Sequence, residues 1–122
     1  MRYLTMIKSV EGKFGPPPAG LYEAVVKLGE DATKAGVLVE TGGLLPAAKG
    51  TFIRFGGDKT KVMDGPYTEA KELVGGYAVY EVKSKDEVME WVRRFINIHT
   101  EYWPGFEGEV EVREMFVVTP GR

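Results

Sequence analysis

The alternation of helix-type and strand-type patterns constrains the fold of this 122-residue chain more than any other feature of its sequence. Apolar residues recur at the spacing of one helix face in two segments, residues 21–35 and 85–95. The second segment follows Ser84 and Glu87, whose spacing is that of a capping box at a helix start. Strand-type runs lie before, between and after the two segments. The sequence thus predicts one α+β domain over residues 1–122.

Six strands are expected, at residues 3–10, 37–40, 51–55, 60–63, 74–82 and 109–117. The third and fourth flank the turn Gly56-Gly57-Asp58-Lys59 and predict a β-hairpin. A long connection is expected from Asn97 to Gly108. Without the hairpin, the order is β-α-β-β-α-β, the ferredoxin-like arrangement. Right-handed crossovers would place both helices on one face of the sheet.

The strand at residues 74–82 is apolar on both of its faces. Tyr77 and Val79 alternate with Ala78, Tyr80 and Val82. A sheet that is apolar on both sides is expected to be covered on both. Because one chain supplies helices for only one face, we expect a second subunit to cover the other in a homodimer.

Composition excludes several classes of site. The chain has no cysteine and a single histidine, so a thiolate nucleophile and a multi-histidine metal site are excluded within one chain. The net charge of -2 argues against a nucleic-acid partner. No apolar stretch approaches the roughly 18 residues of a membrane span, and no leader-type apolar region follows Met1. We expect a cytoplasmic protein without a metal, cofactor or membrane partner.

Three residues are candidates for acid–base catalysis. Asp64 precedes Gly65 and Pro66, a turn that could either be structural or hold the carboxylate at a pocket as a general base. His99 is the side chain suited to proton exchange near neutral pH, but it could equally be a helix-end histidine bonded to a backbone carbonyl. Tyr67 is a candidate proton relay or orienting donor.

Four further residues are candidates for substrate binding. Lys71 and Glu72 lie in a charged run that could also be a solvated surface. Arg113 alternates with two glutamates on the last strand, where it could hold an anionic group or simply face solvent. Trp103 belongs to an aromatic cluster that could cover a cavity mouth or pack in a core or dimer contact.

The chain resembles the YCII-related proteins of the DGPF type. The resemblance rests on Asp64-Gly65-Pro66-Tyr67, Gly75-Gly76-Tyr77, Trp103-Pro104-Gly105 and Glu111-Val112-Arg113. It implies a ferredoxin-like fold and a dimeric α/β-barrel. Smaller relatives have a proposed histidine–aspartate site whose histidine lies in the first helix, and one relative acts as a dehydrochlorinase. The first helical segment here has no histidine, so that pair does not carry over.

Two functions follow as hypotheses. The first is an enzyme that acts on a small organic molecule in a cavity of the dimer, with Asp64 as the base and His99 or Tyr67 as the relay. The second is a non-catalytic module that binds a small ligand or a regulatory partner. The resemblance supports a regulatory link because genes of DGPF-type proteins often neighbour sigma-factor genes. RNA binding on the sheet is disfavoured, since the aromatic sheet motif of RNA-binding domains is absent.

Overall fold

The computed structural model describes residues 1–65 and 72–118. Two helices and six strands appear in the expected order, so the prediction of an α+β fold is confirmed. The elements are β1 (Arg2–Val10), α1 (Leu21–Lys34), β2 (Leu38–Gly43), the short 3-10 helix η1 (Ala47–Lys49), β3 (Thr51–Gly56), β4 (Lys59–Asp64), β5 (Glu72–Glu81), α2 (Lys85–Tyr102) and β6 (Glu109–Glu114).

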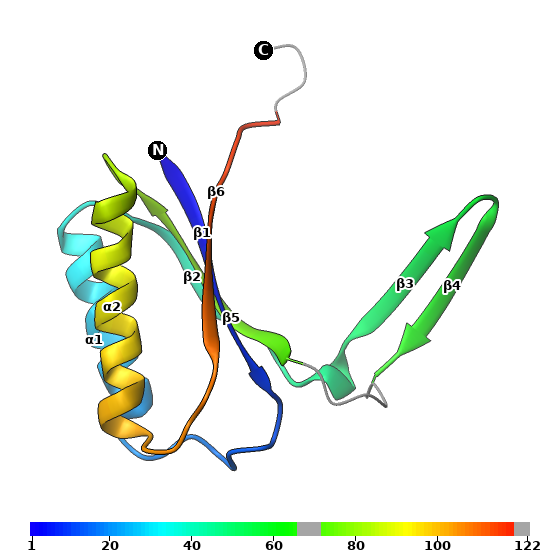
Figure 1. Cartoon of the computed structure of the whole chain (residues 1–122), viewed down its shortest axis with the longest axis horizontal. Helices are drawn as coiled ribbons and strands as arrows, with labels where there is room; N and C mark the ends of the chain where they lie inside the picture. The colour runs from blue at the N-terminus through cyan, green and yellow to red at the C-terminus, as the bar shows by residue number, and fades with distance from the viewer. Residues whose placement is uncertain (66–71, 119–122) are drawn as a thin grey trace.

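Four of the strands form one antiparallel sheet in the order β2-β5-β1-β6, and β3 pairs with β4 as a separate two-stranded sheet. This order is consistent with a ferredoxin-like fold into which a hairpin is inserted. Both helices lie against the same face of the four-stranded sheet (Figure 1). The other face, which we call the open face, carries no helix of this chain in the described residues.

Strand alternation sorts the side chains between the two faces as expected. Tyr3 pairs with Tyr80 and Thr5 with Ala78, and this set faces the helices and belongs to the buried core. The neighbouring pairs, Leu4 with Val79 and Met6 with Tyr77, must then lie on the open face. The sheet is therefore apolar on both sides.

The start of α2 is capped as the sequence predicts. The backbone N–H of Glu87 donates to Ser84 Oγ at 3.2 Å, and the Glu87 carboxylate accepts from the N–H of Lys83 at 2.8 Å. The end of α2 differs from the expectation, because the helix continues to Tyr102 through the first half of the segment expected as a connection. His99 consequently lies in the last part of the helix rather than after it.

An ion-pair cluster joins the two helices. Asp31 of α1 accepts from Lys27, one turn earlier, and from Arg94 of α2, each at 2.7 Å. These hydrogen bonds, led by the one from Lys27, hold the pKa of Asp31 below its usual value. The cluster sets the two helices side by side at the surface of the core.

The β3–β4 hairpin joins the body through a close backbone approach. A Cβ atom at Gly65 would lie 1.8 Å from the carbonyl oxygen of Ala47, so the crossing can form only with glycine at this position. The N–H of Gly65 donates to Gly50 at 2.9 Å, and the N–H of Ala47 donates to the Glu11 carboxylate. From this junction the hairpin projects away from the sheet (Figure 1).

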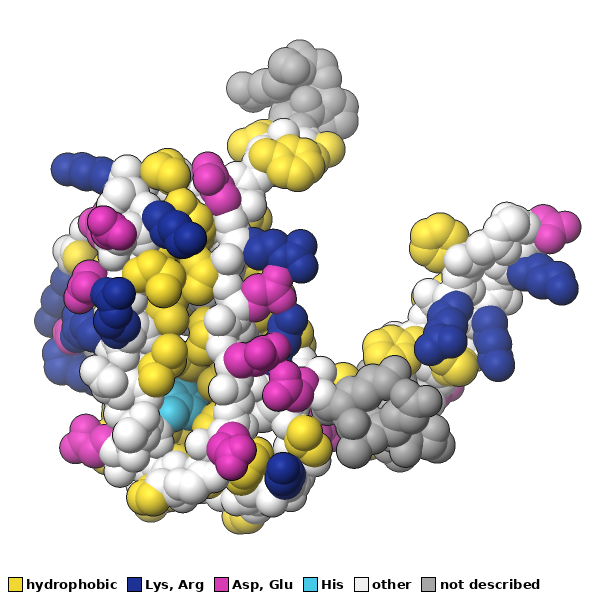
Figure 2. Space-filling model, viewed as in Figure 1, with side chains coloured by type: hydrophobic (Ala, Val, Ile, Leu, Met, Phe, Trp, Pro, Cys, Tyr) yellow, Lys and Arg dark blue, Asp and Glu magenta, His cyan; other side chains and the backbone are white. Residues whose placement is uncertain are grey.

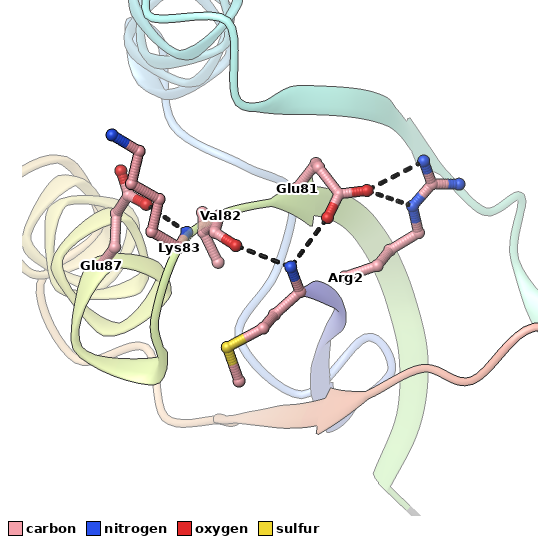
Figure 3. A network of polar contacts seen from close by, with 6 residues as sticks. Arg2, Glu81, Val82, Lys83 and Glu87 are labelled. Atoms are coloured by element: carbon pink, nitrogen blue, oxygen red, sulfur yellow. Dashed lines mark hydrogen bonds and ion pairs between the residues drawn. The ribbon is translucent and has the colours of Figure 1, made fainter.

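The N-terminal end of the sheet is closed by a polar network (Figure 3). The amino group of Met1 donates to the Val82 carbonyl at 2.8 Å and lies 3.0 Å from the Glu81 carboxylate. Arg2 reaches the same carboxylate at 3.2 Å. The hydrogen bond from the amino group, with the neighbouring charge, lowers the pKa of Glu81. This network ties the first residues of β1 to the end of β5.

No helix in the described part of the chain is both long and apolar enough to cross a membrane.

Candidate functional site

A cavity of about 860 Å³ lies between the two helices and the helix-covered face of the sheet. Most of its wall comes from the apolar stripe of α1 and from the inward side chains of α2 and the sheet. Its lining includes Thr5, Ile7, Leu21, Val25, Leu28, Ala78, Tyr80, Val92, Phe95, His99 and Val110. The helical stripes that the sequence predicts do face the sheet, and the cavity beside them is partly open to solvent, because exposed Tyr22 and Val26 of α1 also line it.

The polar groups of the sheet wall are few. Thr5 is buried, and its hydroxyl donates to the Ala78 carbonyl at 3.0 Å. Tyr80 is also buried, and burial raises the pKa of its hydroxyl, which keeps it protonated. The sheet side of the cavity therefore presents an apolar surface with neutral hydroxyl groups.

His99 lies in the wall of this cavity because α2 continues to Tyr102. Its Nδ1 lies 3.0 Å from the Phe95 carbonyl oxygen one turn earlier. A carbonyl can only accept, so Nδ1 must carry the hydrogen and donate it. In the neutral imidazole this leaves Nε2 with a free lone pair, able to accept a proton or a hydrogen bond. The sequence-based alternative of a histidine bonded to a backbone carbonyl is correct, and it is compatible with a site in the cavity.

Aromatic rings surround the imidazole. The ring of Phe95 is centred 4.5 Å from it and that of Phe106 is centred 5.5 Å from it. Phe106 in turn contacts Trp103 at 4.5 Å and Phe14 at 5.1 Å between ring centres. Trp103 is thus one ring removed from His99, and its N–H ends the helix by donating to the His99 carbonyl at 2.9 Å. Hydrophobic side chains gather between α2 and β6, with the chain's one histidine among them (Figure 2).

Asp64 does not contribute to this cavity. It is the last residue of β4 in the projecting hairpin, it is exposed, and its carboxylate accepts from the Thr51 hydroxyl at 2.8 Å. The structure therefore places Asp64 and His99 in different parts of the fold. Tyr67 and Lys71, the other candidates near this turn, lie outside the described residues.

Arg113 and Glu72 also lie away from the cavity. Arg113 pairs in register with Leu4 on the open face and is bonded to Glu111 of its own strand. Glu111 also accepts from Lys8, and the two hydrogen bonds, that of Lys8 first, lower its pKa. The charge of Arg113 is thus partly balanced within the chain. Glu72 begins β5, exposed, opposite Val10.

Tyr77 of β5 and Glu40 of β2 form a polar pair that was not predicted from the sequence, and Tyr77 is also among the residues that line the cavity. The Tyr77 hydroxyl donates to the Glu40 carboxylate at 2.5 Å, and this hydrogen bond, with some burial, raises the pKa of Tyr77. The Tyr77 ring lies over Gly42, where a Cβ would come within 3.1 Å of it. The alternation of β5 indicates that Tyr77 faces away from the helices. The local sequence does not indicate Glu40 as the partner of Tyr77. The strand that contains Glu40 was expected to end at that residue, whereas β2 continues to Gly43.

Within residues 1–65 and 72–118, no three side chains of the metal-binding types come together in a group that could hold an ion. The described cavity thus offers one imidazole, several hydroxyl groups, the charged side chains of Glu30 and Lys34, and an apolar wall.

The comparisons with known proteins identify the family of this chain. The model of the YCII-related domain matches residues 1–115. An uncharacterised protein of Rhizobium meliloti is 31% identical over 88 residues, which cover 72% of this chain and 67% of that protein. The match includes the strands and helices that form the cavity, and the chain belongs to the YCII-related family.

Proposed function

We propose that the cavity binds a small, mainly apolar organic molecule and that Nε2 of His99 accepts a proton or hydrogen bond from it. The observation that carries this proposal is the cavity of about 860 Å³ with the imidazole in its wall. Ligand sites of small molecules typically measure about 300–1,000 Å³ and combine apolar walls with a few polar groups. A ligand with one acidic O–H or C–H bond fits this description.

The chemistry that the site supports is reversible proton transfer. His99 Nε2 would take a proton from the ligand, leaving an anionic ligand beside an imidazolium, and the same nitrogen would return the proton to another atom of the ligand. The hydrogen bond from Nδ1 to the Phe95 carbonyl would hold the ring in the required tautomer. The hydroxyl groups of the wall are available as neutral donors to the ligand.

The second candidate is a binding module without catalysis. One observation favours it: the imidazole is oriented by a carbonyl, whereas catalytic histidines are often oriented by a carboxylate that stabilises the imidazolium. Glu30 is the one carboxylate in the described lining, and it belongs to α1. In this case Nε2 serves only as a hydrogen-bond acceptor that selects the ligand. A regulatory partner would then bind the ligand-occupied form of the protein.

Binding can be tested with N-phenyl-1-naphthylamine, a neutral apolar dye that fluoresces in apolar surroundings. Addition of the protein should raise the fluorescence of the dye in a saturable manner. Ala78→Leu, which adds volume to the cavity wall, should weaken binding at least tenfold. Val79→Leu, the adjacent residue on the open face, is the matched control and should leave binding unchanged. Equal dye binding by both variants would place the dye elsewhere and contradict the proposal.

Catalysis can then be separated from binding with His99→Asn. The asparagine amide can still donate to the Phe95 carbonyl but offers no counterpart of Nε2. If the site is catalytic, exchange of an acidic ligand hydrogen with solvent deuterium should stop while dye binding persists. If the variant retains the exchange, the base is another group, and Glu30, the one carboxylate in the described lining, becomes the candidate to test by Glu30→Gln.

The finer assignments remain proposals. The sequence Asp64-Gly65-Pro66-Tyr67 supports the DGPF subtype within the family, and a cytoplasmic location stays a prediction. We also propose a dimeric α/β-barrel in which the open faces of two copies pack together. Its support is the apolar centre of that face, formed by Leu4, Met6 and Val79, which are half-buried and which no helix of the described chain covers.

A further inference from the structure

We propose that the β3–β4 hairpin is an arm whose apolar face packs against a second copy of this chain. The arm comprises residues 51–64, with β3, the turn and β4. This inference rests on the proposed dimer but not on the proposed ligand. It names a surface outside both the cavity and the four-stranded sheet.

The register of the arm gives it two different faces. Ile53 pairs with Val62 and Phe55 with Thr60, so these four side chains share one face. Ile53 and Val62 are each 61% exposed, and Phe55 is 86% exposed. Arg54, Lys61 and Lys59 occupy the opposite face toward the tip, and Phe52 and Met63 lie on that same face at the base of the arm. The outer part of the arm is therefore amphipathic, with an apolar face and a basic face.

In the described part of the chain, the strands of the arm pair only with each other. A two-stranded hairpin without further packing is only marginally stable in water. Clustered large apolar side chains on a projecting element are typical of interaction surfaces. The apolar face of the arm therefore requires a cover that the described residues of its own chain do not provide.

The position of the arm points to the location of that cover. The arm and the segment after β6 both project on the side of the sheet opposite the helices (Figure 1). That segment is also apolar and exposed, with Phe116 and Val117 each 83% exposed. Two projecting apolar segments thus flank the open face, whose apolar centre is half-buried and has no helix of the described chain over it.

A second copy of this chain is the occupant that can cover all of these apolar surfaces together. A two-fold axis would place the arm of each subunit on the other subunit, in the same contact both times. One type of contact would thus cover the apolar surfaces of both subunits. A stable interface buries about 800 Å² on each partner. The arm and the C-terminal segment would add their exposed apolar side chains to the surface that the sheet supplies.

Charge favours the same arrangement. The basic face of the arm carries Arg54, Lys59 and Lys61, whereas β6, an edge strand of the sheet, carries exposed Glu109 and Glu114. In Figure 2 several basic side chains lie along the arm, and acidic side chains lie along β6 with basic ones among them. An arm that reaches the partner's sheet edge would set these opposite charges near each other and guide the pairing.

Sedimentation velocity across the micromolar range tests the inference on the full chain. The wild type should be a dimer, and Ile53→Thr/Phe55→Ser/Val62→Thr should raise the dimer Kd by about a hundredfold or more. Tyr22→Ser/Val26→Thr is the matched control, because it removes exposed apolar surface from α1 instead. Circular dichroism should show that both variants keep the secondary structure of the wild type.

The outcomes separate the two proposals. A monomeric wild type would overturn both the dimer and the arm contact, whatever the dye-binding result. If Val79→Lys on the open face dissociates the dimer but the arm variant does not, the arm inference alone is wrong. Dissociation by the control variant but not by the arm variant would place the interface on the helices and contradict the inference.

A fluorescent probe gives a second, less disruptive measurement. The chain has no cysteine, so Phe55→Cys and Lys61→Cys each carry one thiol for a polarity-sensitive dye. These positions lie on opposite faces of the arm. On dimer formation the dye at position 55 should shift its emission to shorter wavelength, while the dye at position 61 should change much less. Equal emission at both positions at every concentration would refute the contact.

Discussion

Replacement of Gly65 by alanine is expected to open the junction between the projecting hairpin and the segment that contains η1. A Cβ at this position would lie 1.8 Å from the Ala47 carbonyl oxygen and 2.7 Å from the carbonyl carbon. Both are backbone atoms, so no rotamer change relieves the clash. One segment must move by roughly 1.5 Å or more to restore an ordinary van der Waals separation.

The free-energy cost of Gly65→Ala can be worked out from the contacts that the added Cβ would disturb. Overpacking at a rigid site costs about 1–3 kcal/mol. The hydrogen bond from the Gly65 N–H to the Gly50 carbonyl, at 2.9 Å, would be lengthened as well, and such a bond contributes about 1 kcal/mol. The sum is about 2–4 kcal/mol. It is bounded by the free energy of detaching the hairpin, because the four-stranded sheet can stay folded when the junction opens.

Hydrogen exchange measured by mass spectrometry is the appropriate assay. Exchange across residues 50–65 should accelerate about 30-fold or more, as expected for a local cost of about 2 kcal/mol, while peptides from β1 and α2 stay protected. Gly56→Ala in the same hairpin is the control, since its Cβ would meet nothing within 4 Å. If Gly65→Ala exchanges like the wild type throughout, the steric account of the Asp-Gly-Pro turn is refuted.

Three further predictions concern capping, pH and a tyrosine. Ser84→Ala should lower the free energy of unfolding by about 1 kcal/mol in urea titrations, because it removes the N-cap of α2; an unchanged midpoint would contradict the capping role. The hydrogen bond from Lys27 holds the pKa of Asp31 down, so this group stabilises the fold above its unfolded pKa near 4, and that contribution is lost as the pH falls below it. Thermal unfolding of Asp31→Asn should therefore depend less on pH in this range than that of the wild type. Glu40→Gln should lower the pKa of Tyr77 toward its ordinary value, measured by ultraviolet titration; a titration curve identical to that of the wild type would argue against the pair.

Local pattern predicted the elements of this fold well. Helical spacing in the two stripes and alternation in β5 depend on neighbours a few residues apart, so they are readable without tertiary information. The separation of Tyr77 and Val79 from Ala78 and Tyr80 follows from alternation alone, and the structure confirms it. The hairpin likewise follows from a Gly-rich turn between two β-prone runs.

Element ends were harder to predict. The end of α2 was expected near Asn97, but the helix continues to Tyr102, because Asn and His are weak helix formers that do not by themselves stop a helix. β2 was expected to end before its glycines, yet Gly42 and Gly43 pair with β5 in the sheet. Both differences matter for function, since they bring His99 to the cavity and Glu40 to Tyr77.

The candidate site was also predicted only in part from the sequence. His99 was singled out by residue type, and its bond to a carbonyl was one of the readings left open. Asp64 was singled out by a turn motif whose glycine is required for a close backbone crossing, and the structure places that carboxylate on the hairpin, outside the cavity. A sequence motif can indicate that a turn requires glycine without indicating which surface the side chain beside that glycine faces.

The amino-acid sequence by itself determined the order of the elements, the two-faced character of the sheet and the limits on chemistry that follow from one histidine and no cysteine. These properties depend on composition and on spacings of two to four residues. Only the tertiary structure decided that a partly open cavity lies beside the helices and the sheet, that His99 lines it, and that the hairpin projects with an apolar face. Each of these depends on how residues distant in sequence fill the space between them, and short-range periodicity carries no information about that volume.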